Sequence, residues 1–294
     1  MSTPTAHKFG LSFEYFPPKS LDASFRLWNA IETLSAFDPD FVSITYGAGG
    51  TTREITRSAV GVVAKNYDYE VAGHLTCVGA TKAETMAVAR EYGEVGATQI
   101  VALRGDPPKG EDKFTPHPDG FSGSLELIRA LADLNQFKIR VSAYPNTHPE
   151  AASAQADIDA LKAKFDAGAH SAISQFFFEK DDFLFFRDAC VKAGITQKII
   201  PGIFPIENWS KTRNFAKMCG TPTPDWMDSA FGNCKDRETE RLLSTAMCTE
   251  LCDDLLSEGV EDLHFYTLND PSLTREVCRA LGRTLRHPKL RAAS

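Results

Sequence analysis

Apolar runs alternate with amphipathic segments along most of the chain. Eight short runs are rich in β-branched and aromatic residues, at 11–16, 41–47, 71–79, 99–105, 139–145, 171–178, 198–205 and 262–269. Runs of this kind predict strands that are covered on both faces. Segments with apolar residues at helical spacing lie in most of the intervals, for example at 24–37, 83–95, 124–134 and 156–168. The pattern therefore predicts strands and helices in alternation.

This alternation favours parallel pairing with crossover helices, and eight units predict an α/β fold of the (β/α)8 TIM barrel type. An open doubly wound sheet is the alternative, but no G-x-G-x-x-G follows the first strand to cradle a dinucleotide. Two segments interrupt the rhythm: a Pro/Gly-rich loop at 104–123 and extra helical material at 220–260 before the last strand. We expect one domain over residues 1–294.

Composition excludes several classes of protein. The chain has 294 residues and a net charge of −7, with its basic residues dispersed, which argues against a nucleic-acid surface. It has neither a run of about 18 apolar residues nor the layout of a signal peptide, so we expect a cytoplasmic protein without membrane contact. Its seven cysteines show no C-x-x-C spacing, so neither a disulfide framework nor a zinc site is indicated.

Polar residues gather where the predicted strands end, and in such a barrel the loops that follow the strands build the site. Each residue alone has an ordinary structural explanation, but their convergence on one rim favours a functional site. Several of them could be metal ligands, yet no H-x-H or H-E-x-x-H spacing supports this, and we predict no metal. The rim residues are Glu14, Thr45, Tyr46, His74, Thr76, Arg104, Asp106, Tyr144, His148, Gln175 and Tyr266.

Glu14 is the most unusual of these residues. It lies in the apolar stretch LSFEYFPPKS, between Phe13 and Tyr15. A buried carboxylate is costly to ionise, so Glu14 is satisfied by partners, turned to solvent, or kept for proton chemistry.

The order of motifs closely resembles the methylenetetrahydrofolate reductase family over residues 10 to 282. These motifs are FEYFPPK, FVSITYGAGG, GHLTC, IVALRGDPP, YPNTHPEA, QADIDALKAKFDAGA, ISQFFF, IIPGIFPI and HFYTLN. The resemblance implies a flavin-dependent (β/α)8 barrel that uses NADH or NADPH to convert 5,10-methylenetetrahydrofolate to 5-methyltetrahydrofolate. It also implies a ping-pong mechanism through FAD, in one-carbon metabolism and methionine biosynthesis.

In this resemblance Glu14 matches the general acid that protonates N10 of the folate, and burial in an apolar strand would raise its pKa and keep it protonated. Asp106 matches the aspartate beside the flavin and the pterin, where its charge would tune the ring. Matches to FAD-binding positions are Thr45, His74, Arg104, Gly105, Asp106, Tyr144, His148, Asp157 and Lys164. Matches to substrate-binding positions are Gln175, Lys211, Phe215, Tyr266 and Leu268.

The chain departs from the family pattern at a few positions. Asp270 replaces an arginine expected at the folate's anionic tail, Lys211 stands where some relatives have glutamine, and Ala160 and Ala163 stand where some have Asn and Arg near FAD. We expect the catalytic barrel without the regulatory domain of eukaryotic relatives.

The sequence leaves several alternatives open. It does not choose between NADH and NADPH, although resemblance to short bacterial members favours NADH, nor does it give the direction of the reaction or decide between a monomer and a homo-oligomer. Another flavin-dependent barrel, similar to proline dehydrogenase, is one alternative function, and a folate-binding relative without catalysis is another.

Overall fold

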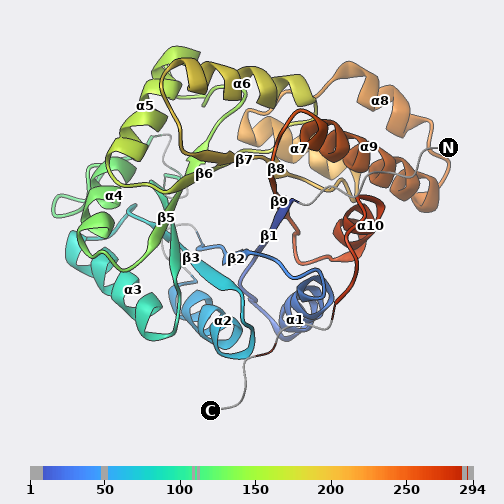
Figure 1. Ribbon diagram of the computed structural model, residues 1–294. Coiled ribbons are helices and arrows are strands. Elements are labelled where there is room, and N and C mark those ends of the chain that lie inside the picture. The colour runs from blue at the N-terminus through green and yellow to red at the C-terminus, as the bar shows by residue number, and fades with distance from the viewer. Residues whose placement is uncertain (1–8, 48–51, 108–109, 111–112, 287–289, 291–294) are drawn as a thin grey trace.

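A ring of parallel strands with helices around it forms the centre of the molecule (Figure 1). The computed structural model describes residues 9–47, 52–107, 110, 113–286 and 290, so residues 48–50 of the FVSITYGAGG motif lie outside it. Within the described residues the strands are β1 (Gly10–Tyr15), β2 (Phe41–Ile44), β3 (Glu70–Thr76), β4 (Gln99–Leu103), β5 (Lys138–Ala143), β6 (Ser171–Ser174), β7 (Lys198–Ile200), β8 (Gly202–Ile203) and β9 (Asp262–Tyr266).

Helices follow most of the strands, as the alternation predicted. The first helix begins three residues before the predicted segment, because the Ser20 side chain accepts a hydrogen bond from Ala23 N and caps it. In the same described ranges the helices are α1 (Leu21–Ser35), α2 (Arg53–Asn66), α3 (Lys82–Glu94), α4 (Ser124–Asp133), α5 (Ala154–Asp166), α6 (Lys180–Lys192), α7 (Trp209–Cys219), α8 (Asp225–Gly232), α9 (Arg237–Ser257) and α10 (Ser272–Ala280).

The barrel closes through β7 and β8, which share the position of one predicted strand. Pro201 separates them, and its missing N–H cannot contribute to a strand ladder. The segment β7 pairs with β6, whereas β8 pairs with β9, and every pairing between strands is parallel. The nine segments therefore occupy the eight positions of a (β/α)8 TIM barrel, and the predicted fold is confirmed.

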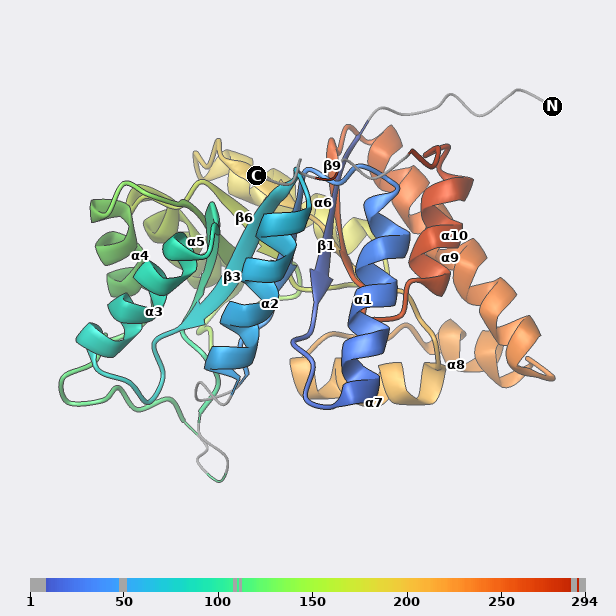
Figure 2. The same cartoon turned by 90° about the horizontal axis from the view of Figure 1, so that it is seen from below.

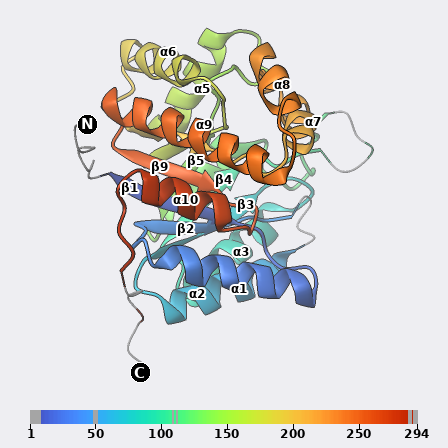
Figure 3. The ribbon, with the colours of Figure 1, turned by 90° about the vertical axis from the view of Figure 1, so that its right-hand side faces the viewer.

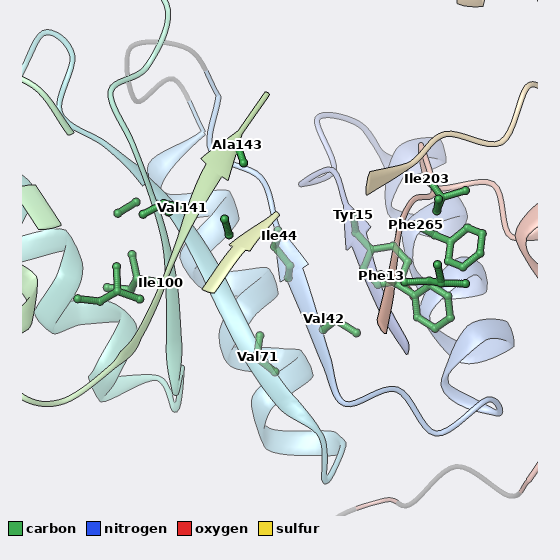
Figure 4. Packing of buried hydrophobic residues seen from close by; sticks show 14 of the residues in the cluster. Phe13, Tyr15, Val42, Ile44, Val71, Ile100, Val141, Ala143, Ile203 and Phe265 are labelled. Carbon is green, nitrogen blue, oxygen red and sulfur yellow. The ribbon is translucent and has the colours of Figure 1, made fainter. Parts of the chain in front are cut away.

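Alternation along each strand separates two apolar regions. Phe13 and Phe265 are fully buried in the cluster that joins strands to helices, with their ring centroids 6.3 Å apart (Figure 4). A second cluster, formed by residues on the opposite strand faces, fills the lower barrel interior and consists of Phe41, Ala72, Val101, Ile173 and Ile200. Polar side chains also point into the barrel, nearer than this second cluster to the carboxyl ends of the strands.

The inserted helical material covers two parts of the barrel. The helices α7 and α8 lie at the end of the barrel toward which β1 points (Figure 2). The long α9 packs beside α10 over β9 and β1 (Figure 3). Of these helices, α8 and α9 lie within the segment 220–260, where extra helical material was expected. No helix among the described residues is long and apolar enough to cross a membrane.

Candidate active site

Glu14 lies inside the barrel, near the carboxyl end of β1. Phe13 points outward into the core, so the strand alternation turns Glu14 inward. Its Oε2 atom lies 3.1 Å from Nε2 of His74 and 3.7 Å from Nε2 of His264. The Ser43 hydroxyl donates to the same oxygen at 3.4 Å. The side chain is 15% exposed, so its charge is partnered by protein groups more than by solvent.

The two imidazoles determine the ionisation of Glu14. Burial raises the pKa of this carboxyl, but the positive charges of His74 and His264 outweigh burial and bring the pKa from 4.5 down to about 2. The expectation that an apolar strand keeps Glu14 protonated is therefore wrong for the ligand-free protein. That expectation considered burial alone and did not include the imidazoles that β3 and β9 place beside Glu14 inside the barrel.

His264 lies behind Glu14 and was not among the predicted site residues. It is fully buried, and its Nδ1 lies 2.8 Å from Ser12 Oγ. Its ring stacks on Phe41 with centroids 5.6 Å apart and an interplanar angle of 13°. The signal for it was present in the sequence, because His264 is two residues before Tyr266 and shares its strand face.

A cavity of about 330 Å³ is lined by Glu14 and opens at the carboxyl ends of the strands. Phe215 forms an aromatic wall with Phe176 and Phe204, and its ring centroid lies 5.6 Å from the centroid of each. The Gln175 Oε1 atom accepts a hydrogen bond from Phe176 N at 3.0 Å. The amide nitrogen of Gln175 is thus the end that can donate to a ligand.

A second cavity, of about 430 Å³, carries the basic residues of the site. The Lys164 ammonium donates to Ser142 O at 3.0 Å, and burial lowers its pKa to about 8. The Arg104 guanidinium makes two hydrogen bonds to the Glu150 carboxylate, at 2.5 and 3.0 Å. Thr76 Oγ1 is buried and has no hydrogen-bond partner among the described residues. This cavity offers donors and positive charge to an anionic ligand.

The structure brings together nearly all of the predicted site residues. Glu14, Thr45, His74, Asp106, Tyr144, Gln175, Phe215, Tyr266 and Leu268 line the first cavity. Arg104, Gly105, Asp106, Tyr144, His148, Asp157 and Lys164 line the second. Asp106 and Tyr144 line both, so the two cavities adjoin. Lys211 lines neither of them and lies in the first turn of α7, close to Glu207.

A third cavity, of about 660 Å³, lies beside Asp270. Burial, followed by the charge of Asp270, raises the pKa of Glu207 to about 7, although Lys211 and Arg237 oppose this. Two carboxyl groups thus lie where the family pattern led us to expect an arginine. No group of three His, Cys, Asp or Glu side chains in the described part of the chain could hold a metal ion.

The loop after β9 is fixed to the end of β1. The Asn269 side chain accepts from Phe16 N at 2.9 Å and donates to Phe16 O at 3.0 Å. Leu268 and Asn269 have φ angles of 49° and 59°, a left-handed conformation that costs a residue such as leucine about 1–3 kcal/mol. The Asn269 contacts hold this conformation and keep Leu268 at the first cavity. Sequence reasoning found Leu268 but missed Asn269.

Comparisons with known proteins agree with the sequence motifs. The model of the family described as methylenetetrahydrofolate reductase matches residues 2–282. A 5,10-methylenetetrahydrofolate reductase of Salmonella typhimurium is 43% identical over 276 residues, which cover 94% of this chain and 91% of that protein. The protein of the same name from Escherichia coli gives the same identity and coverage.

A solved structure from Clostridium thermocellum shares the fold. That protein is described as uncharacterised and as binding two copies of 5-methyl-5,6,7,8-tetrahydrofolic acid. The TM-score is 0.59 at 15% identity, with 94% of this chain and 96% of that chain covered. This likeness supports the barrel fold alone. The family match and the bacterial relatives are similarities of amino-acid sequence over nearly the whole chain. On those two findings, the chain belongs to the methylenetetrahydrofolate reductase family.

Proposed function

We propose that this protein interconverts 5,10-methylenetetrahydrofolate and 5-methyltetrahydrofolate, with NADH or NADPH as the hydride donor and FAD as the resident cofactor. In the reductive direction the overall reaction consumes the folate, one nicotinamide hydride and one proton. FAD, when bound, supplies the hydride chemistry between the two substrates. Because both substrates would use the cavity beside Phe215, they bind in turn, which gives a ping-pong mechanism.

The observation that carries this proposal is the junction of the two cavities at Asp106 and Tyr144. One cavity has a carboxyl group and an aromatic wall, and the other has Arg104 and Lys164. An elongated cofactor with an anionic middle and a flat ring fits this arrangement, with its anionic part near the basic residues. Its ring would then lie at the junction, beside the substrate.

The residues of the second cavity fit FAD in their donor chemistry. Lys164 and Arg104 would bind the pyrophosphate and ribose region, since charge-assisted donors bind such oxygens strongly. The unpartnered Thr76 hydroxyl is a further donor that a ligand oxygen would satisfy. Asp157 accepts from His148 N at 2.8 Å and so fixes the loop that forms this wall.

In the first cavity the proposed roles concern the folate or the nicotinamide. Glu14 would donate a proton to N10, so that the N10–methylene bond breaks and its electron pair stays on N10. Asp106 would disfavour excess electron density on the flavin ring and hold the pterin. The Gln175 amide would donate to a polar edge of the substrate, while Phe215 would stack on either substrate.

An anaerobic absorption experiment tests the proposal. Protein loaded with FAD should lose its flavin bands on addition of NADH or NADPH and regain them on addition of methylenetetrahydrofolate. Glu14→Gln should bind FAD and react with the nicotinamide nucleotide but fail to respond to the folate. A flavin that is reduced but ignores folate would favour a different flavin-dependent barrel, and protein that takes up no FAD would refute the flavoenzyme.

A further inference from the structure

A three-residue chain, Glu14–His264–Ser12, links two neighbouring strands inside the barrel, beneath the first cavity. It joins β1 to β9 at neighbouring positions, because Ser12 pairs with His264 and Glu14 with Tyr266 in the strand register. His264 and Ser12 are 0% and 2% exposed, and neither lines the cavity. Only Glu14 connects this chain to a bound ligand.

The hydrogen bonds of Ser12 fix one hydrogen of His264. Ser12 Oγ has one hydrogen and two contacts, to Leu263 O at 3.3 Å and to His264 Nδ1 at 2.8 Å. Both contacts are hydrogen bonds only when the hydroxyl donates to the carbonyl and accepts from the imidazole. Nδ1 of His264 then carries a hydrogen.

This assignment places one further proton between His264 and Glu14. Nε2 of His264 faces Glu14 Oε2 at 3.7 Å and is buried without a hydrogen-bond partner among the described residues. A lone pair facing a carboxylate would be repelled, so a proton belongs either on Nε2 of His264 or on Glu14. Nε2 of His74 lies 3.1 Å from the same oxygen but lines the cavity, so His264 is the imidazole of the two that is closed off from it. The two groups therefore hold one dissociable proton between them.

The surroundings keep this proton from being locked on His264. The pKa of His264 lies below its ordinary value of 6.5, because burial and the charges of Arg140 and His74 lower it more than the Glu14 carboxylate raises it. The Arg140 guanidinium lies over the Phe41 ring, 3.7 Å from its centroid. His264 stacks on the same Phe41 ring. Tyr266 is the other titratable group near the ring, with its own ring edge 5.4 Å away.

We propose that His264 is a positioning residue that stores a proton for Glu14. This inference rests on the proposed reduction of the folate. The Nε2–H bond of His264 breaks and an O–H bond forms on Glu14. That O–H bond then breaks as N10 takes the proton, so Glu14 ends as a carboxylate. His264 keeps its Nδ1–H bond to Ser12 and becomes neutral. The next proton enters from solvent through the cavity that Glu14 lines.

The stored proton accounts for two properties of Glu14 that otherwise conflict. The low pKa of Glu14 makes it a carboxylate in the ligand-free protein, whereas acid catalysis needs its protonated form. A partner whose Nε2 carries the proton 3.7 Å from Glu14 Oε2 provides both, once the two atoms approach to hydrogen-bond distance. The carboxylate is stable at rest, and it becomes an acid when the ligand takes its proton.

Nitrogen NMR of the histidine rings tests the stored proton without any substrate. Protein with 15N-labelled histidine contains seven such residues, and loss of one signal set in His264→Gln identifies His264. As the pH falls from about 8 to about 5, we expect Nδ1 to keep its hydrogen and Nε2 to take one up, and Glu14→Gln should weaken this uptake because the carboxylate favours it. A His264 ring without hydrogen on Nδ1 would overturn the proposal, as would an Nε2 signal that Glu14→Gln leaves unchanged.

Rapid mixing tests the role in the reaction. We expect His264→Gln to slow the folate-dependent return of the flavin bands by about 10- to 100-fold, part of the roughly 10²–10⁴-fold that proton transfer supplies. The nicotinamide-dependent bleaching should stay unchanged, as should both steps in the control His170→Gln at the other end of the barrel.

The outcomes separate the inference from the proposed function. Equal slowing of both steps in His264→Gln would overturn the inference, because a structural defect would act on both. Wild-type protein that ignores folate would refute the proposed function, while the NMR signals would still decide whether the proton is shared.

Discussion

Replacement of Glu14 by glutamine should reduce the amount by which the free energy of unfolding falls at acidic pH. The folded-state pKa of about 2 lies below the ordinary value of 4.5, so the carboxylate stabilises the fold above about pH 5. This contribution is lost as the pH falls from 4.5 toward 2. Linkage between these two pKa values gives a loss of about 2 kcal/mol between about pH 5 and pH 3, at about 1.4 kcal/mol per pKa unit.

Urea unfolding at several pH values between about 3 and 6 measures this contribution. The free energy of unfolding of the wild type should fall by about 2 kcal/mol more than that of Glu14→Gln between about pH 5 and pH 3. The control Glu261→Gln changes a side chain that is 78% exposed and should follow the wild type. If the free energy of unfolding falls by the same amount in the wild type and in Glu14→Gln over this pH range, the account of Glu14 as a partnered carboxylate is refuted.

Three further substitutions test the cavities and the core. Lys164→Met should raise the dissociation constant of FAD by about 10- to 100-fold in a fluorescence titration, because a hydrogen bond to a charged group contributes about 1.5–3 kcal/mol. Unchanged affinity would remove Lys164 from the site. Glu150→Gln should free Arg104 and tighten FAD binding by about 3- to 10-fold at low salt, with a smaller gain at high salt; weaker binding would contradict competition between Glu150 and the ligand. Phe265→Ala should lower the free energy of unfolding in urea by about 3–5 kcal/mol, since the ring is fully buried, and a loss below about 1 kcal/mol would contradict its place in the core.

The barrel was predictable because each strand and helix carries its own local pattern. The eight apolar runs became strands, and the fold follows from their alternation with helices. The division at Pro201 was visible in the letters KIIPGIF, yet it was read as one strand, because period and composition do not show which neighbour each half pairs with. Only the closed sheet shows that β7 pairs with β6 and β8 with β9.

The rim residues were predictable for a similar reason, since the carboxyl ends of parallel strands meet at one end of a barrel. The partners of those residues were not. Glu14 and His264 are 250 positions apart, and their contact depends on the closure of β1 against β9. The Arg104–Glu150 pair likewise joins two separate loops. Charged groups that are paired only in the folded chain leave no periodic signal in the sequence.

Differences in burial between these pairs bear on how a ligand would enter the site. The Arg104–Glu150 pair is 31% and 50% exposed, and such surface pairs contribute little to stability, so an anionic ligand can replace Glu150 at small cost. The Glu14–His264 pair is 15% and 0% exposed, and separation of a buried pair leaves an uncompensated charge. A ligand would therefore displace the first pair and leave the second intact. The Arg104–Glu150 pair, which a ligand can separate, is suited to binding. The Glu14–His264 pair is suited to proton transfer, because a ligand can take a proton from it while the two side chains stay in place.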